Sequence, residues 1–153
     1  MRLPHLRVLA VGACLALGLG GCGAATRPPS PTPADFPGIT RVLGPLWIAA
    51  SDIVSGDAGC DDRHLAPTAI SFSASGLDQA TPVRMYLYIF RDHDAFERNL
   101  GAIDSCARSY VGDSAGYEKI AVSPYVIAGQ GPWSPTFTST LTQALTEAAG
   151  SGG

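Results

Sequence analysis

The sequence predicts an α+β fold, a two-layer sandwich in which an antiparallel sheet of about four strands carries two helices on one face. Three observations lead to this class. Short runs rich in β-branched and aromatic residues come in two pairs, and a segment with apolar residues at helical spacing follows each pair. Two cysteines remain in the predicted domain to form one disulfide. A single globular domain is expected over residues 38–149, followed by a disordered tail at 150–153.

The first pair of strands is predicted in the middle of the chain. Residues 68–75 alternate apolar and small polar side chains, and residues 83–90 read VRMYLYIF, a pattern typical of a strand buried in part on both faces. The turn-rich residues between them favour an antiparallel pair. The preceding residues 38–59 are ambiguous, because Gly44-Pro45 interrupts a weak helical spacing while WIAASDIV fits a short strand.

A helix is predicted to follow Arg91. Asp94 and Glu97 have the spacing of a capping box, and Asp92 is the alternative cap. Apolar residues then recur every three or four positions and define one face, beside Cys106: Phe96, Leu100, Ile103, Ala107 and Tyr110. The outer face is expected to carry Arg98, Asp104 and Arg108. Gly112 is expected to end the helix.

The second pair of strands is predicted at residues 119–122 and 125–128. A hairpin turning at Ser123-Pro124 is favoured over one strand bent at the proline. Ser134-Pro135 is typical of a helix start, with serine at the cap and proline in the first turn. The helix that follows places four apolar residues on one face before Gly150: Phe137, Leu141, Leu145 and Ala148.

The amino-terminal residues 1–21 form a predicted export signal, with Arg2 and Arg7 before an apolar stretch that is shorter than the roughly 20 residues of a membrane-spanning helix. Leu19-Gly20-Gly21-Cys22 resembles the lipobox of bacterial lipoproteins. The resemblance implies cleavage before Cys22 and attachment of acyl chains such as palmitate to that cysteine. Residues 22–37 would then be the lipidated cysteine and a proline-rich tether. Cleavage without lipidation and an uncleaved membrane helix are the alternatives.

Cys60 and Cys106 remain once Cys14 is removed with the signal and Cys22 carries lipid. An even pair in an exported protein indicates a disulfide. A metal site is the rival interpretation, because Asp61, Asp62 and His64 lie close to Cys60 in the sequence. The close ligand pairs typical of zinc sites are missing, so no metal is expected.

The composition excludes some classes of function. The chain of 153 residues has a net charge of −3, and removing Arg2 and Arg7 with the signal leaves 8 basic and 13 acidic residues, a net charge of −5. An acidic domain without a basic stripe is not expected to bind nucleic acid. The glycines before Trp133 lack the lysine of a phosphate-binding loop, and no cofactor is expected.

Catalysis has few candidate residues. Asp92-His93-Asp94 is explained by helix capping, and the acidic loop that contains Asp57 and His64 is explained as a solvated loop beside a disulfide. We therefore expect a protein that is not an enzyme. An envelope enzyme using His64 or Asp92 and His93 is kept as an alternative. Tyr125 and Trp133 are the candidates for a small-ligand groove, although Trp133 packing under the last helix is the simpler interpretation.

Cys22 with its tether, the predicted disulfide and the run MYLYIFRDHDAFERNL leading into the helix together resemble the small cell-envelope lipoproteins of actinobacteria, including mycobacteria. There is a more distant likeness to the extracellular sensor domains of PknH-like serine/threonine kinases. The resemblance implies a domain held by lipid at the extracytoplasmic face of the cell membrane, where it binds a ligand or an envelope protein. A structural accessory subunit of an envelope complex is the third possibility.

Overall fold

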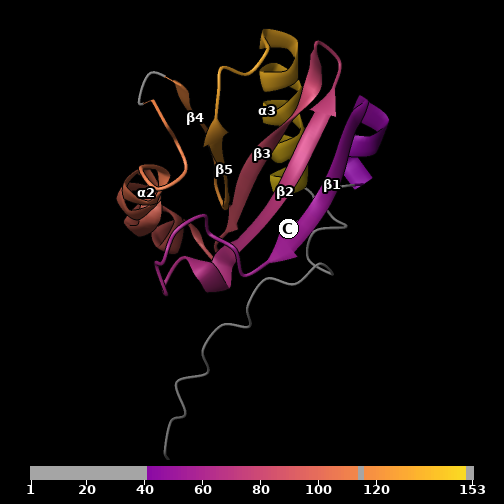
Figure 1. Ribbon diagram of the computed structural model, residues 1–153. Helices are drawn as coiled ribbons and strands as arrows, with labels where there is room; N and C mark the ends of the chain where they lie inside the picture. The colour runs from indigo at the N-terminus through magenta and orange to yellow at the C-terminus, as the bar shows by residue number, and fades with distance from the viewer. Residues whose placement is uncertain (1–40, 114–115, 151–153) are drawn as a thin grey trace, which may run out of the picture.

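The structure is a computed structural model that describes residues 41–113 and 116–150. Its centre is one five-stranded sheet in which every neighbouring pair is antiparallel, in the order β1-β2-β3-β5-β4 (Figure 1). The strands are β1 (Ile48–Ser55), β2 (Ala69–Gly76), β3 (Gln79–Ile89), β4 (Tyr117–Val122) and β5 (Tyr125–Gln130). Two α-helices lie wholly within the described residues, α2 (His93–Ala107) and α3 (Pro135–Gly150), and residues 41–43 are also helical. The short 3-10 turns are η1 (Gly44–Leu46) and η2 (Ala66–Thr68).

The predicted α+β class, the antiparallel sheet and both predicted strand pairs are confirmed. The sheet has five strands rather than about four, because the ambiguous segment WIAASDIV forms the edge strand β1. A bulge interrupts the pairing of β1 with β2 between Ser51 and Val54, and Asp52 lies there with a φ of 52°. A bulge of this kind limits pairing along a free edge.

The two helices lie on opposite faces of the sheet, which differs from the predicted two-layer arrangement (Figure 1). Met85 and Leu87 pack in a cluster with the buried face of α3. Tyr86 and Tyr88 point the other way and pack with α2. Because alternate side chains of a strand point to opposite faces, residues 85–89 of β3, which are apolar at every position, need cover on both sides.

Helix α2 begins at one of the two predicted caps and ends earlier than predicted. Asp92 is the cap, since its Oδ1 accepts a hydrogen bond from the backbone N–H of Ala95 at 2.7 Å. Phe96 and Ile103 are buried on the predicted face. The helix ends at Ala107, five residues before the predicted end at Gly112, because hydrogen bonds between near neighbours turn the chain over the next three residues.

A disulfide joins Cys60 to Cys106, as predicted, with 5.5 Å between the two Cα atoms. It ties the carboxyl end of α2 to the loop that leads from β1 to β2. Gly59 in this loop has a φ of 75°, and a Cβ there would lie 2.5 Å from the ring of Tyr110 and 2.7 Å from that of Tyr86. Only glycine therefore fits at this close approach.

The export signal, Cys22, the tether and residues 151–153 lie outside the described residues. Within the described residues, no helix combines the length and the apolar character needed to span a bilayer.

Candidate ligand-binding site

A pocket of about 710 Å³ opens between the carboxyl-terminal half of α2 and strand β4. Its volume falls within the range of roughly 300–1,000 Å³ that is usual for small-molecule sites. The residues that line it come from these two elements and the turn after α2: Asp104, Ala107, Arg108, Val111, Tyr117 and Lys119.

The local geometry explains why these side chains converge. Tyr117 and Lys119 pair with Gln130 and Ala128 in the sheet register, and Ala128 belongs to the cluster that packs with α2. Alternation along β4 therefore points both side chains toward α2. Asp104 lies in the last turn of α2, and Arg108, four residues later, follows its final residue with helical backbone angles, so the two side chains lie on the same side.

Asp104 is the centre of the polar contacts in the pocket. Its Oδ1 accepts hydrogen bonds from Lys119 Nζ at 2.5 Å and from the Tyr117 hydroxyl at 2.9 Å. Partial burial alone would raise the pKa of Asp104, but the hydrogen bonds from Lys119 and Tyr117 outweigh it and lower the pKa below its ordinary value. Burial, together with the Asp104 carboxylate, raises the pKa of Tyr117. At neutral pH the pocket therefore holds an ionised Asp104 and a protonated Tyr117.

The charges of the pocket do not cancel. Arg108 is exposed and forms no ion pair within the described part of the chain, whereas Lys119 shares its charge with Asp104. The Lys119 side chain is 25% exposed and the Asp104 side chain is 47% exposed. Arg108 and Lys119 carry two positive charges and Asp104 carries one negative charge, so the pocket has an excess of one positive charge. The helix dipole places about half a negative charge at the carboxyl end of α2, which reduces this excess.

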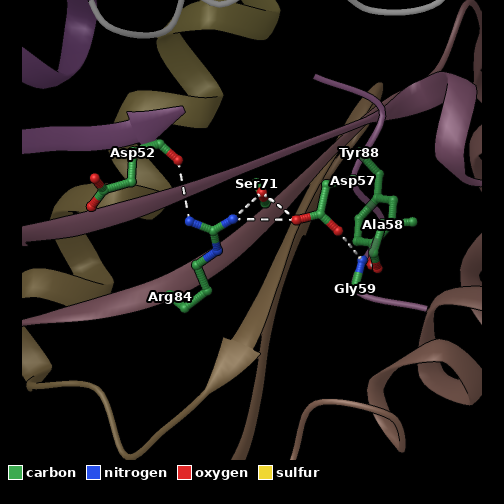
Figure 2. Close-up of polar contacts among 7 residues, drawn as sticks. All are labelled: Asp52, Asp57, Ala58, Gly59, Ser71, Arg84 and Tyr88. Atoms are coloured by element: carbon green, nitrogen blue, oxygen red, sulfur yellow. Dashed lines mark hydrogen bonds and ion pairs between the residues drawn. The ribbon is translucent and has the colours of Figure 1, made fainter. Parts of the chain in front are cut away.

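A second polar cluster ties the loop after β1 to the sheet (Figure 2). Asp57 Oδ2 accepts hydrogen bonds from the Ser71 hydroxyl at 2.6 Å and from Arg84 Nη2 at 3.2 Å. Arg84 Nη1 also donates to the backbone carbonyl of Asp52 in the bulge, at 3.1 Å. Ser71 is fully buried, so a substrate cannot reach its hydroxyl. These contacts hold the loop in place and supply no nucleophile.

The candidate catalytic residues lie at the surface. His93 Nδ1 is 3.3 Å from the Ser123 hydroxyl, and His93 Nε2 is 3.9 Å from a carboxylate oxygen of Glu97. The His93 and Glu97 side chains are 69% and 55% exposed, so water competes for each of these contacts. His64 lies in the loop before η2, and no hydrogen bond or ion pair joins it to His93 among the described residues.

The acidic loop beside Cys60 has a structural role. Asp62 Oδ1 accepts hydrogen bonds from the backbone N–H groups of His64 and Leu65, at 2.8 and 3.1 Å. A side chain that binds its own backbone in this way stabilises a turn. Asp57 fixes the other half of the loop through the N–H of Gly59, at 2.9 Å.

Tyr125 and Trp133 are not part of the pocket. Trp133 is 5% exposed, and its indole N–H donates to the carbonyl of Gln130 at 3.1 Å. It packs with α3, as the simpler interpretation of the sequence expects, and Tyr125 packs against the same cluster. Both lie on the α3 face of the sheet, whereas the pocket lies on the α2 face. The sequence predicts Asp104 and Arg108 on the outer face of the helix, and no local pattern in it indicates that β4 faces them.

The pocket is lined by N–H donors on one side and by apolar side chains beside them. Arg108 and Lys119 suit carboxylate or phosphate oxygens, and Ala107 and Val111 offer methyl groups beside them. No protein family, curated protein or solved structure matches this chain.

Proposed function

We propose that the protein is a lipid-anchored extracytoplasmic domain that binds a small organic acid in the pocket between α2 and β4, without a catalytic step. The observation that carries the proposal is the position of Arg108 and Lys119 on two sides of a pocket large enough for a small molecule. The acid group of the ligand would lie between these two cations, and its apolar part would contact Ala107 and Val111.

The chemistry of the two cations supports an acidic ligand. The planar guanidinium of Arg108 presents paired N–H donors that match a carboxylate or a phosphate group. Lys119 Nζ has three hydrogens, so it retains donors for a ligand while one of them binds Asp104. Because the pocket is open to water, we expect binding to weaken as the salt concentration rises.

Two features support the anchor and the location. Leu19-Gly20-Gly21-Cys22 follows an apolar stretch at the position where a lipoprotein signal is cut. The Cys60–Cys106 disulfide is consistent with an oxidising compartment outside the cytosol, because structural disulfides are rare where thiols are kept reduced. Acyl chains on Cys22 would bind the membrane firmly if two or more are attached.

Replacement of Cys22 tests the anchor. We expect the native chain to sediment with membranes and to have the mass of an acylated chain that begins at Cys22. A Cys22→Ser chain should be released into the soluble fraction, while Cys14→Ser should change nothing. Firm membrane attachment of the Cys22→Ser chain would contradict the proposed anchor.

Matched pairs of small probes test the ligand site. The full chain, purified in a non-ionic detergent, is titrated with hexanoate and with hexanamide while the backbone amide NMR signals are recorded. Hexanoate should shift the signals of residues 104–111 and 117–119 at a lower concentration than hexanamide. Acetate should bind more weakly than hexanoate, because it lacks the apolar chain. Absence of any shift at these residues would contradict a ligand site there.

A hydrolytic function is the second candidate, and the approach of His93 to the Ser123 hydroxyl is the observation that favours it. An ester such as p-nitrophenyl acetate tests it. Turnover that disappears in both Ser123→Ala and His93→Gln would support hydrolysis. A rate equal to that of the buffer would exclude it for this ester.

A further inference from the structure

Two exposed apolar side chains lie at one end of the sheet. Trp47 is 81% exposed and Leu77 is 41% exposed. Trp47 immediately precedes Ile48, which pairs with Gly76, and Leu77 immediately follows Gly76. The start of β1 therefore lies beside the β2–β3 turn (Figure 1). We call Trp47 and Leu77 the apolar tip.

The backbone makes both residues unusual at their positions. Trp47 follows η1 with a φ of 63°, and Leu77 occupies the β2–β3 turn with a φ of 54°. Glycine or asparagine is the usual residue in this left-handed conformation, both after a helix and in a tight hairpin. At each position a large apolar side chain occupies a strained backbone and remains exposed. Packing within the domain does not explain this combination of exposure and backbone strain.

The course of the chain connects the apolar tip with the anchor. The described chain begins at Arg41, six residues before Trp47, and Cys22 lies 19 residues before Arg41. A segment of that length spans at most about 65 Å when it is fully extended. The lipid-bearing end of the chain therefore leads to η1 and the apolar tip. A segment of this length allows the domain to reach the membrane surface, but it does not determine which side of the domain faces the membrane.

We infer that the apolar tip inserts into the interfacial layer of the membrane that holds Cys22, so that the domain stands on this end. The inference rests on the proposed lipid anchor. Tryptophan is enriched at the interface of membranes, because its ring is apolar while its N–H can bind water or headgroups. Two side chains alone would hold a domain weakly, but the anchor keeps them at a high local concentration.

This orientation leaves the ligand pocket accessible. The apolar tip lies at the β2–β3 turn, beside the start of β1. Lys119 of the pocket pairs with Ala128, which pairs with Tyr86, seven residues along β3 from Gln79 at the turn. At about 3.4 Å per residue, the pocket lies roughly 24 Å along the strands from the turn. A membrane that touches Trp47 and Leu77 would therefore not cover the pocket between α2 and β4.

Tryptophan fluorescence tests the inference directly, because Trp133 is buried and leaves Trp47 as the exposed reporter. The full lipidated chain is reconstituted into phosphatidylcholine vesicles, and quenching by acrylamide is compared with that of the Cys22→Ser chain in solution. We expect a blue-shifted emission and quenching reduced by about half on the vesicles. Leu77→Ser should restore part of the quenching. Ile53→Ser is the matched control, because Ile53 is 40% exposed but lies toward the other end of β1. This substitution should leave the quenching on vesicles unchanged.

Flotation of the vesicles separates the possible outcomes. If the chain floats with the vesicles while Trp47 remains as accessible as in solution, the inference is overturned and the anchor stands. If the chain does not float, the anchor fails and the inference fails with it. If Trp47 of the soluble chain becomes protected as the protein concentration rises, a second copy covers the apolar tip and membrane contact is overturned.

Discussion

Asp78 caps helix α3 by accepting a hydrogen bond from the backbone N–H of Phe137 at 2.9 Å, across 59 positions of the chain. Its other carboxylate oxygen accepts from the N–H of Thr136 at 3.0 Å. The predicted cap, Ser134, has the expected position before Pro135, but its hydroxyl donates to the carbonyl of Asp78 instead. The β2–β3 turn is thereby joined to the start of α3.

Asp78→Ala should lower the melting temperature of the protein. The substitution leaves two N–H groups at the start of α3 without the carboxylate that accepts from them and that complements the helix dipole. Asp78→Asn should lower the melting temperature less than Asp78→Ala does, because the amide oxygen still accepts one hydrogen bond. Thermal unfolding followed by circular dichroism measures both variants. Asp61→Ala, at an exposed aspartate, is the control and should have no effect; equal melting temperatures for all three would contradict the role of Asp78.

The Asp57 network should make stability depend on pH. Partial burial alone would raise the pKa of Asp57, but hydrogen bonds from Ser71, the N–H of Gly59 and Arg84 lower it below its ordinary value. A carboxyl whose pKa is depressed by folding stabilises the protein above its unfolded pKa, and this contribution disappears as the pH falls through the folded pKa. The stability difference between native protein and Asp57→Asn should therefore shrink from about pH 5 to pH 2. Urea unfolding at several pH values measures it, and a constant difference would contradict this role.

Loss of the disulfide should destabilise the domain strongly. The sequence separation of Cys60 and Cys106 is 46 residues. Closing a loop of that length contributes about 4 kcal/mol on the chain-entropy model. The double substitution Cys60→Ala and Cys106→Ala should lower the free energy of unfolding by an amount of this order, as measured by urea denaturation. A reductant should lower the stability of the native chain and leave that of the double variant unchanged.

Two neighbouring tyrosines should respond in opposite ways to removal of their hydroxyls. Tyr88 is fully buried, and its hydroxyl donates to the carbonyl of Ala58 at 2.9 Å. Burial raises the pKa of Tyr110 to about 12, and its buried hydroxyl, which lies near that of Tyr88, forms no hydrogen bond of normal geometry among the described residues. Tyr88→Phe should cost about 1 kcal/mol of unfolding free energy, whereas Tyr110→Phe should be neutral or stabilising. A larger loss in Tyr110→Phe than in Tyr88→Phe would show that this hydroxyl has a partner.

Local patterns predicted much of the fold. The spacing of Phe96 and Ile103, and that of Phe137 and Leu141, identified the faces of both helices that are buried. The run VRMYLYIF also indicated burial on both faces of β3, which requires a covering layer on each side. The sequence nevertheless predicts both helices on one face, because periodicity shows which residues share a face and not which element covers it.

The site depended on long-range contacts that no local pattern contains. Lys119 and Asp104 are 15 positions apart. They meet because the pairing of β4 with β5 points Lys119 to the face of the sheet that α2 covers. Arg84 reaches Asp57 across 27 positions, and Asp78 reaches Phe137 across 59. A capping pattern such as Ser134-Pro135 located the start of α3 correctly, but it did not reveal that Asp78 supplies the acceptor.

Substitution of the charged residues that line the pocket tests the central claim most directly, with hexanoate as the probe. Lys119→Met and Arg108→Met should each weaken hexanoate binding about tenfold, since each removes a charge-assisted hydrogen bond. Asp104→Asn should strengthen binding, because it removes the carboxylate that Asp104 contributes to the lining of the pocket. NMR titration of the full chain and its three variants gives the dissociation constants, and circular dichroism checks that each variant folds. Equal affinity in all four proteins, or weaker binding in Asp104→Asn, would contradict an acid-binding site.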